Sequence, residues 1–215
     1  MRVAIVAPSP IPFVVGGAEK LWWGMQRHIN ENTTHSCELL KVPVKEHTVV
    51  DLLQAYYQFF TLDLSSYDRV ISTKYPAFMV QHPDHHLYLQ HLLRGCYDTY
   101  SAQLSTMPPW ANQNLQRLLR TISRHDIDLT DIFNELFSFI QQHPDDRQFN
   151  QFPGPMIRSI LHTLDRRGME GVKQFSAISH TVKKRVEYFP PAAQVTVIHH
   201  PSNLTVFDNN GQNYL

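Results

Sequence analysis

The sequence predicts an α/β fold in which a parallel β-sheet is flanked by helices and carries a helical insertion. Short apolar runs, which suit strands buried on both faces, alternate with segments whose apolar residues recur at helical spacing. The alternation stops between Cys96 and Gly171, where three helical patterns follow one another. The length of 215 residues suits one domain with such an insertion, and it is enough to bury a core without disulfides or metal.

The opening of the chain predicts a strand, a glycine-containing loop and a helix. Residues 2–7 form an apolar run that ends at Pro8, and a proline-containing loop leads to Gly16 and Gly17. Apolar residues then recur with the period of an amphipathic helix. They are Ala18, Leu21, Trp22, Met25 and Ile29. This order is typical of the first half of a β-α-β unit.

The same rhythm continues on both sides of the insertion and indicates a parallel sheet of the Rossmann-like kind. Further strands are expected at residues 38–44, 67–72, 87–90, 175–179 and 195–199. Helices are expected at residues 48–60, 77–80 and 181–188. The strand at 87–90 is expected to end at His91, which places this histidine at the carboxyl edge of the sheet.

The insertion, expected at about residues 97–171, predicts three helices with unequal charge. Their apolar stripes cover residues 115–122, 129–140 and 157–164, and Asp128 is positioned to cap the second. Three arginines share one face of the first helix, and Trp110 precedes it, whereas residues 126–146 carry several acids. The arginines are Arg117, Arg120 and Arg124. Two interpretations are open: contact with an anionic membrane surface, or docking on the domain with the arginines paired to those acids.

Composition excludes several classes of protein. The 19 Lys and Arg residues balance the 19 Asp and Glu residues, so the chain lacks the broad positive footprint of a nucleic-acid-binding protein. The two cysteines, Cys37 and Cys96, make no disulfide framework, and we expect both to be small buried residues in a reducing compartment. No membrane-spanning run and no signal peptide is recognised. We therefore expect a cytoplasmic protein, with peripheral contact at the inner membrane face as a further hypothesis.

Candidate ligand-binding residues follow the predicted strands, because ligands of open parallel sheets bind at the carboxyl ends of the strands. Gly16 and Gly17 open the first helix, where backbone N–H groups attract anions, although this feature alone favours a tight turn without a ligand. His91 suits a hydrogen bond to a sugar hydroxyl or a carbonyl, or a purely structural role. Four more residues flank this edge, with surface solvation as the alternative. They are Lys74, Tyr75, Arg94 and Tyr97.

Metal and nucleophile motifs are not supported. His82, His85 and His86 lack a thiolate partner, and no H-E-x-x-H sequence occurs, so we expect no metal site. The sequence also lacks the G-x-S-x-G motif of a serine nucleophile.

Three segments together resemble the N-terminal half of family-4 glycosyltransferases of the GT-B fold, and the resemblance covers both ends of the chain but not the insertion. They are MRVAIVAPSPIPFVVGGAEK, YDRVISTKYPAFMVQHPDHHLYLQHLLRGCYD and FSAISHTVKKRVEYFPPAAQVTVIHHPSN. The resemblance implies retaining transfer of a sugar from a nucleotide sugar to a glycan or lipid-linked glycan acceptor, as in polysaccharide biosynthesis. It implies no bound metal or other cofactor.

The resemblance also assigns roles to individual residues. Gly16 and Gly17 match the loop near the donor diphosphate, His91 matches a histidine near the transferred sugar, and Lys74 and Tyr75 match a loop facing the cleft. The N-terminal domain, expected at 1–205, mainly binds the acceptor. Residues 206–215 would begin the linker to a C-terminal donor domain, which is the expected partner and carries the paired glutamates E-x(7)-E. Because half a cleft cannot preorganise the leaving diphosphate, this chain alone is expected to transfer little or no sugar.

Two other functions remain in competition. A stand-alone, non-catalytic Rossmann-like binding module would need no second domain. A dinucleotide-dependent oxidoreductase is disfavoured because the third glycine of G-x-G-x-x-G is missing and no clear acidic residue ends the second strand, where Lys45 precedes Glu46.

Overall fold

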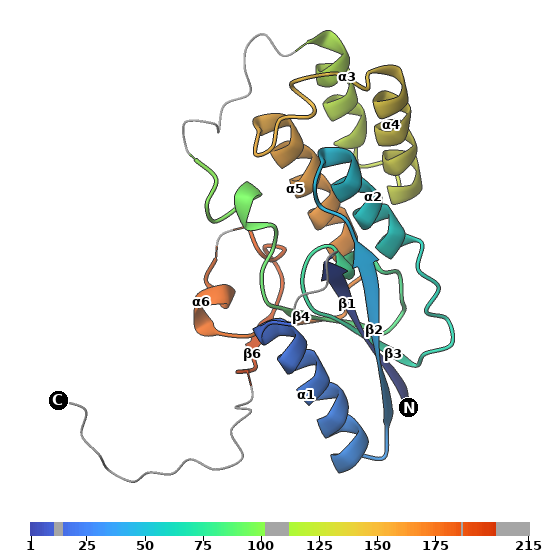
Figure 1. The fold of residues 1–215 in the computed structure, drawn as a ribbon, viewed down its shortest axis with the longest axis vertical. Coiled ribbons are helices and arrows are strands. Elements are labelled where there is room, and N and C mark those ends of the chain that lie inside the picture. The colour runs from blue at the N-terminus through green and yellow to red at the C-terminus, as the bar shows by residue number, and fades with distance from the viewer. Residues whose placement is uncertain (11–14, 102–111, 186, 201–215) are drawn as a thin grey trace, which may run out of the picture.

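The computed structural model describes residues 1–10, 15–101, 112–185 and 187–200. Its centre is a six-stranded, all-parallel sheet with the strand order β2-β1-β3-β4-β5-β6 (Figure 1). The strands are β1 (Arg2–Pro10), β2 (Ser36–Val44), β3 (Arg69–Ser72), β4 (His85–Leu89), β5 (Gln174–Ala177) and β6 (Val195–Val197). The predicted α/β, Rossmann-like fold is therefore confirmed.

The helices follow the predicted apolar stripes. They are α1 (Gly17–Asn32), α2 (Val49–Phe60), α3 (Gln113–Ile122), α4 (Leu129–Gln142), α5 (Pro155–Met169) and α6 (His180–Lys183), with short 3-10 turns η1 (Ala77–Met79) and η2 (Arg94–Cys96). The Asp128 carboxylate accepts a hydrogen bond from the Asp131 amide at 2.8 Å, which confirms the predicted cap of α4. No helix in the described ranges is long and apolar enough to cross a bilayer.

Alternate residues of the strands supply two separate cores, as the period of two in a β-strand requires. On one face, Val3, Ile5 and Ala7 of β1 pack with Leu21 and Trp22 of α1. On the other face, the strands pack with α2, α5 and η1. The strand residues of this second core include Ala4, Val6, Val70, Leu87 and Leu89. Figure 1 shows α1 on one side of the sheet and α2 to α5 gathered on the other.

The predicted insertion builds the outer part of this second layer. The α3 and α4 helices pack against each other and against α5, and the ring centroids of Phe133 on α4 and Tyr57 on α2 lie 5.2 Å apart. The α5 helix belongs to the second core, on the face of the sheet opposite α1. It leads the chain from the insertion into β5, so it is also the crossover helix between β4 and β5. The boundaries of the predicted domain stay a prediction, because residues 201–215 lie outside the described part of the chain.

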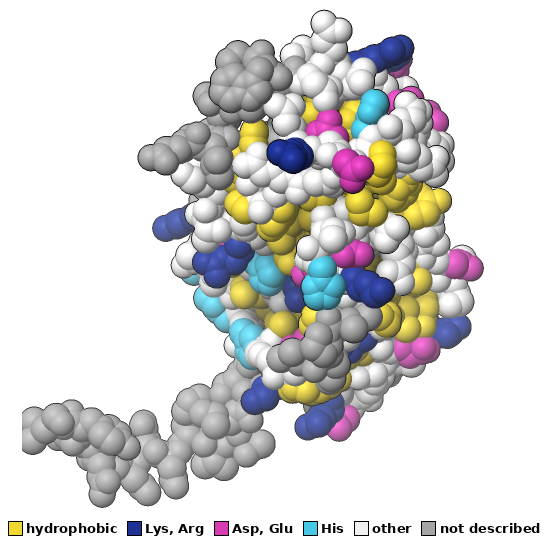
Figure 2. Space-filling model, turned by 45° about the horizontal axis from the view of Figure 1, so that its top comes forward, with side chains coloured by type: hydrophobic (Ala, Val, Ile, Leu, Met, Phe, Trp, Pro, Cys, Tyr) yellow, Lys and Arg dark blue, Asp and Glu magenta, His cyan; other side chains and the backbone are white. Residues whose placement is uncertain are grey.

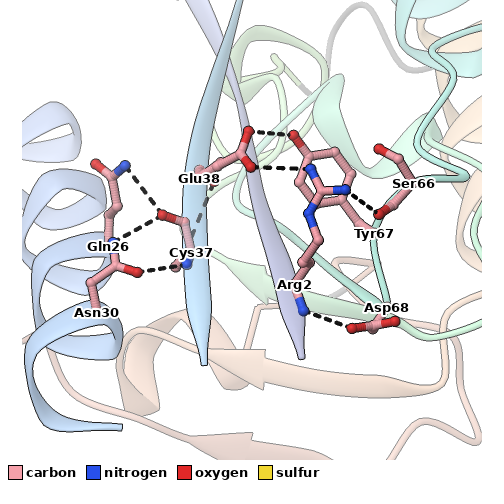
Figure 3. A network of polar contacts seen from close by, with 8 residues as sticks. All are labelled: Arg2, Gln26, Asn30, Cys37, Glu38, Ser66, Tyr67 and Asp68. Atoms are coloured by element: carbon pink, nitrogen blue, oxygen red, sulfur yellow. Dashed lines mark hydrogen bonds and ion pairs between the residues drawn. The ribbon is translucent and has the colours of Figure 1, made fainter. Parts of the chain in front are cut away.

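A polar network ties the amino-terminal edge of the sheet together, opposite the edge where ligands are expected (Figure 3). The Arg2 amide donates to Asp68 at 2.6 Å, and its guanidinium donates to Glu38 at 3.3 Å. Nearby, the Asn30 side chain of α1 accepts from the Cys37 amide at 2.7 Å and donates to the Cys37 carbonyl at 2.9 Å. The Asn30 amide thus satisfies backbone groups of the edge strand β2 and fixes α1 against it.

Several strand boundaries differ from the predictions, among them the end of β5 at Ala177 rather than 179 and the end of β6 at Val197 rather than 199. Three further differences concern the segments that lead to the carboxyl edge. The β1 strand continues past Pro8 to Pro10. Beyond Val6 it pairs with β2 but no longer with β3, so the prolines interrupt no hydrogen bonds between β1 and β3. The β4 strand ends at Leu89, so His91 follows the strand by two residues rather than ending it.

The third difference is that α6 stops at Lys183, which makes the predicted helix over 181–188 wrong beyond that point. Glu187 has a left-handed backbone with a φ of 65°, which a continuing helix cannot contain. Tyr188 is buried and donates from its hydroxyl to the Asp98 carboxylate at 2.7 Å, so this long-range contact holds the chain in another path.

Candidate functional site

The carboxyl ends of β1 and β3 form the topological switch point of the sheet. Here the chain leaves β1 toward α1 on one face and leaves β3 toward η1 on the other. A crevice at such a point is the usual ligand site of open α/β sheets. The predicted site residues follow β1, β3 and β4 at this edge, and a space-filling view shows His side chains beside Lys and Arg side chains across the middle of one face (Figure 2).

Gly16 and Gly17 begin α1, but a side chain of the same helix already binds there. The Gly16 amide donates to the Glu19 carboxylate at 2.8 Å, and Glu19 is only 5% exposed. This contact places a negative charge at the positive end of the helix. No atom of the described residues lies within 4 Å of the position that a Cβ atom at Gly17 would take.

Lys74 lies in the loop after β3, and its side chain extends toward α1. Its Nζ atom lies 5.5 Å from the centre of the Trp22 ring. Burial lowers the pKa of Lys74, and the nearby charges of Glu46 and Glu19 oppose part of that shift. Lys74 follows β3 and the glycine turn follows β1, so both lie at the carboxyl edge of the sheet.

His91 lies in the loop that follows β4, next to the same lysine. Its ring centre is 5.6 Å from that of Tyr75, and its Nδ1 atom is 2.9 Å from the Leu92 carbonyl. A carbonyl only accepts, so Nδ1 carries the proton of the neutral ring and Nε2 keeps its lone pair. Nε2 is then an acceptor suited to a hydroxyl proton.

The surroundings of His91 keep its ring neutral. Burial is the main cause that lowers the pKa of His91, and the Leu92 carbonyl opposes this shift. The positive charges of Lys74, Arg94 and Arg185 lower the pKa further. The imidazole is therefore set among three cations, of which Arg185 comes from the segment after α6.

Arg94 and Arg185 are held by a shared carboxylate. Asp98 lies 3.4 Å from Arg94 Nε and 2.9 Å from Arg185 Nη1. The Arg94 side chain remains 60% exposed, whereas the Asp98 side chain is only 17% exposed. Sequence reasoning missed both Asp98 and Arg185. Asp98 follows Arg94 by four positions, a spacing that could have indicated the pair, whereas no local spacing links Arg185 to either.

The hydroxyls of both predicted tyrosines donate to carboxylates of the fold. Tyr75 is 9% exposed, and its hydroxyl donates to Glu46 at 3.3 Å. Tyr97 donates to Asp165 at 2.6 Å, and its ring stacks on His162 with centroids 4.1 Å apart. Of the predicted residues, Gly16, Gly17, Lys74, His91 and Arg94 are brought to one edge. The ring of Tyr75 lines this edge, and Tyr97 belongs to the buried network below it.

Asp165 is a fully buried carboxylate that sequence reasoning also missed, because it interrupts the apolar stripe of α5. It accepts from Tyr56 of α2 at 2.8 Å as well as from Tyr97. Burial raises the pKa of Asp165 to about 7, although both tyrosine hydroxyls oppose the shift. This network ties α2, α5 and the loop after η2 together behind the site.

The histidines near β4 each have partners within the fold. His85 is buried with Nε2 2.7 Å from Ser72 Oγ, and burial lowers its pKa to about 4. His86 Nε2 lies 2.9 Å from Ser176 Oγ, and His82 contacts backbone atoms through both ring nitrogens. Across the described ranges, no three His, Cys, Asp or Glu side chains are grouped to hold a metal ion.

The helix proposed for membrane contact has its apolar side inside the protein. Leu115, Leu118, Leu119 and Ile122 of α3 belong to the main core. Arg124 pairs with Asp126, one of the acids that follow the helix. The apolar side of α3 is therefore docked on the domain, whereas no ion pair among the described residues joins Arg117 or Arg120 to the acids of residues 126–146. Trp110 lies outside the described residues.

The chain was compared with protein-family models, with curated proteins and with solved structures, and none of them matches it.

Proposed function

We propose that the chain is the acceptor-side domain of a retaining glycosyltransferase, which moves a sugar from a nucleotide sugar to a hydroxyl of a glycan or lipid-linked glycan. One observation carries this proposal: the glycine turn before α1, Lys74 and His91 converge on one carboxyl edge at the switch point of a parallel sheet. Such a constellation suits a ligand that combines hydroxyl groups with negative charge.

The residues of this edge would act by binding and orientation. The neutral His91 ring offers Nε2 to a sugar hydroxyl, because its Nδ1 proton is engaged by Leu92. Lys74 and the amides at the start of α1 present positive charge toward a phosphate.

The nucleotide would be held mainly by a second domain. The family resemblance assigns the paired glutamates and the diphosphate clamp to that domain, and we propose that this chain alone transfers little or no sugar. A coding sequence that continues beyond Leu215 into a second β-α-β run with E-x(7)-E supports the proposal. A natural stop codon there favours a non-catalytic module.

One observation favours the alternative of a non-catalytic binding module. Glu19 already occupies the N-terminus of α1 through the Gly16 amide and is nearly buried. Because the Glu19 carboxylate already accepts from this amide, the N-terminus of α1 requires no bound phosphate. Glu19→Gln separates the two functions: a diphosphate-binding site should bind pyrophosphate more tightly after this change, whereas a structural cap should leave binding absent.

Isothermal titration of the chain with UDP-glucose, GDP-mannose and pyrophosphate tests the proposed site. We expect weak binding that Lys74→Met lowers about tenfold, the usual effect of removing one charged hydrogen bond. Lys173→Met is the matched control, because Lys173 is exposed near the opposite edge, where its amide bonds to His85. Binding that both variants leave unchanged would exclude Lys74 from the site.

His91 is tested in the two-domain enzyme that we propose. His91→Ala should lower turnover strongly while the urea midpoint of unfolding changes little, because the ring is only partly buried. Near-normal rates in this variant would remove His91 from the site.

A further inference from the structure

A groove of about 880 Å³ runs along α1 on the face of the sheet that α1 only partly covers. One wall is the side of α1 from Lys20 to Asn32, a distance of about 18 Å at ~1.5 Å per residue. The floor and the other wall come from the sheet and the chain after β6. They include Ile71, His86, Tyr88 and Ile198.

The groove leaves apolar surface exposed where a parallel sheet is normally covered. All-parallel sheets occur almost only with both faces packed against other elements. Here α2, α5 and α6 contribute to the core on the opposite face, and α1 packs mainly over β1 and β2. Ile198 remains 45% exposed and Trp23 remains 38% exposed, and both line the groove.

A glycine lies on the side of α1 that lines the groove. Gly24 lies at the middle of the helix and lines the groove. Glycine inside a helix costs about 1 kcal/mol relative to alanine, so it usually has a packing reason. With no side chain at this point, another backbone can come closer to α1 than ridges of side chains allow.

The charges along the groove favour an acidic occupant. Lys20 and Arg27 are two turns apart on the groove side of α1, and neither forms an ion pair with any residue that the structure describes. Among the lining residues that the structure describes, Glu31 is the one acid; it follows Arg27 by four residues on α1 and leaves Lys20 at the other end of the groove without a nearby acid of the lining. Acids spaced by two turns on an incoming helix would face both cations.

We propose that this groove binds an amphipathic α-helix of a partner polypeptide, with apolar residues toward the sheet and acidic residues toward Lys20 and Arg27. A helix satisfies its own backbone hydrogen bonds, whereas an extended segment on the face of a sheet would leave its backbone groups unpaired. A helix of about 12 residues matches the length of the groove. The mode of recognition is that of a helix in an apolar groove, and it does not depend on the function proposed for the carboxyl edge of the sheet.

Two designed helical peptides of about 14 residues test the proposal by fluorescence polarisation at neutral pH. Both carry leucines at i, i+3, i+4 and i+7, and they differ only in having glutamates or lysines on the flank. We expect the glutamate peptide to bind about tenfold more tightly than the lysine peptide. The double variant Lys20→Glu with Arg27→Glu should reverse this preference.

A second pair of variants tests the position. Gly24→Leu should abolish binding of the glutamate peptide by filling the groove, and Gln54→Leu on the exposed side of α2 should leave it unchanged. Equal binding of the two peptides, no binding, or binding that survives Gly24→Leu would overturn the proposal. So would a dimer in light scattering that Gly24→Leu converts to monomer, because the occupant would then be a second copy.

Discussion

Replacing Asp165 with asparagine should remove a pH dependence of stability that the fold creates by burying this carboxylate. Asp165 is enclosed between Tyr56 and Tyr97, and burial raises its pKa from 3.8 to about 7. The folded state therefore keeps the proton between pH 4 and 7, whereas the unfolded state releases it. Stability from this group is full below pH 4 and falls as the pH rises through 7.

The size of the effect follows from the two pKa values. Each pH unit in this window changes the free energy of unfolding by ~1.4 kcal/mol, so the total from 3.8 to about 7 is about 4 kcal/mol. The asparagine introduced by Asp165→Asn carries no titrating proton, and its amide can still accept from one tyrosine and donate to the other. Relative to the Asp165→Asn protein, the parent should lose about 4 kcal/mol between pH 4 and 7.

Urea unfolding at several pH values, followed by Trp fluorescence, measures this difference directly, since Trp22 is fully buried. The contributions of other titrating groups to the pH dependence cancel in this difference, because both proteins contain those groups. Tyr97→Phe serves as a second variant: it removes one donor to the carboxylate, so the window should extend to higher pH. A difference between parent and Asp165→Asn that stays constant from pH 4 to 7 would refute the reasoning.

Three other expectations follow from the packing and the capping. Burial lowers the pKa of His85 from 6.5 to about 4, so the contribution of His85 to the free energy of unfolding is full above pH 6.5 and falls by about 3 kcal/mol toward pH 4. His85→Gln should remove this pH dependence in the same urea titration. A Cβ at Gly168 would lie 2.4 Å from Met79 Sδ, so Gly168→Ala should cost about 1–3 kcal/mol, while Gly171→Ala, with nothing within 4 Å, should cost little in thermal unfolding. Asp128→Ala should cost about 1 kcal/mol and fray the start of α4 in hydrogen exchange; unchanged exchange there would contradict the cap.

The sheet and most helices could be predicted from the sequence because their signals are local. The apolar runs of β1 and β2 and the stripe of α4 each identify one element without knowledge of its neighbours. The same reasoning placed Gly16, Lys74 and His91 at one edge, since parallel strands bring their carboxyl ends together.

The direction of side chains could not be predicted in the same way. Asp165 meets partners 109 and 68 positions away in the chain, and these contacts turn the hydroxyl of Tyr97 inward. The end of α6 depends on Tyr188 reaching Asp98, another contact between distant residues. Such pairings depend on how the layers are stacked, which local periodicity does not specify.

The most direct measurement of the proposed function is backbone-amide NMR of the chain during titration with a nucleotide diphosphate sugar and, separately, with an oligosaccharide. The account predicts one contiguous set of shifted signals that includes Gly17, Lys74 and the loop around His91. Shifts confined to other parts of the molecule, or an unchanged spectrum with both ligands, would contradict it.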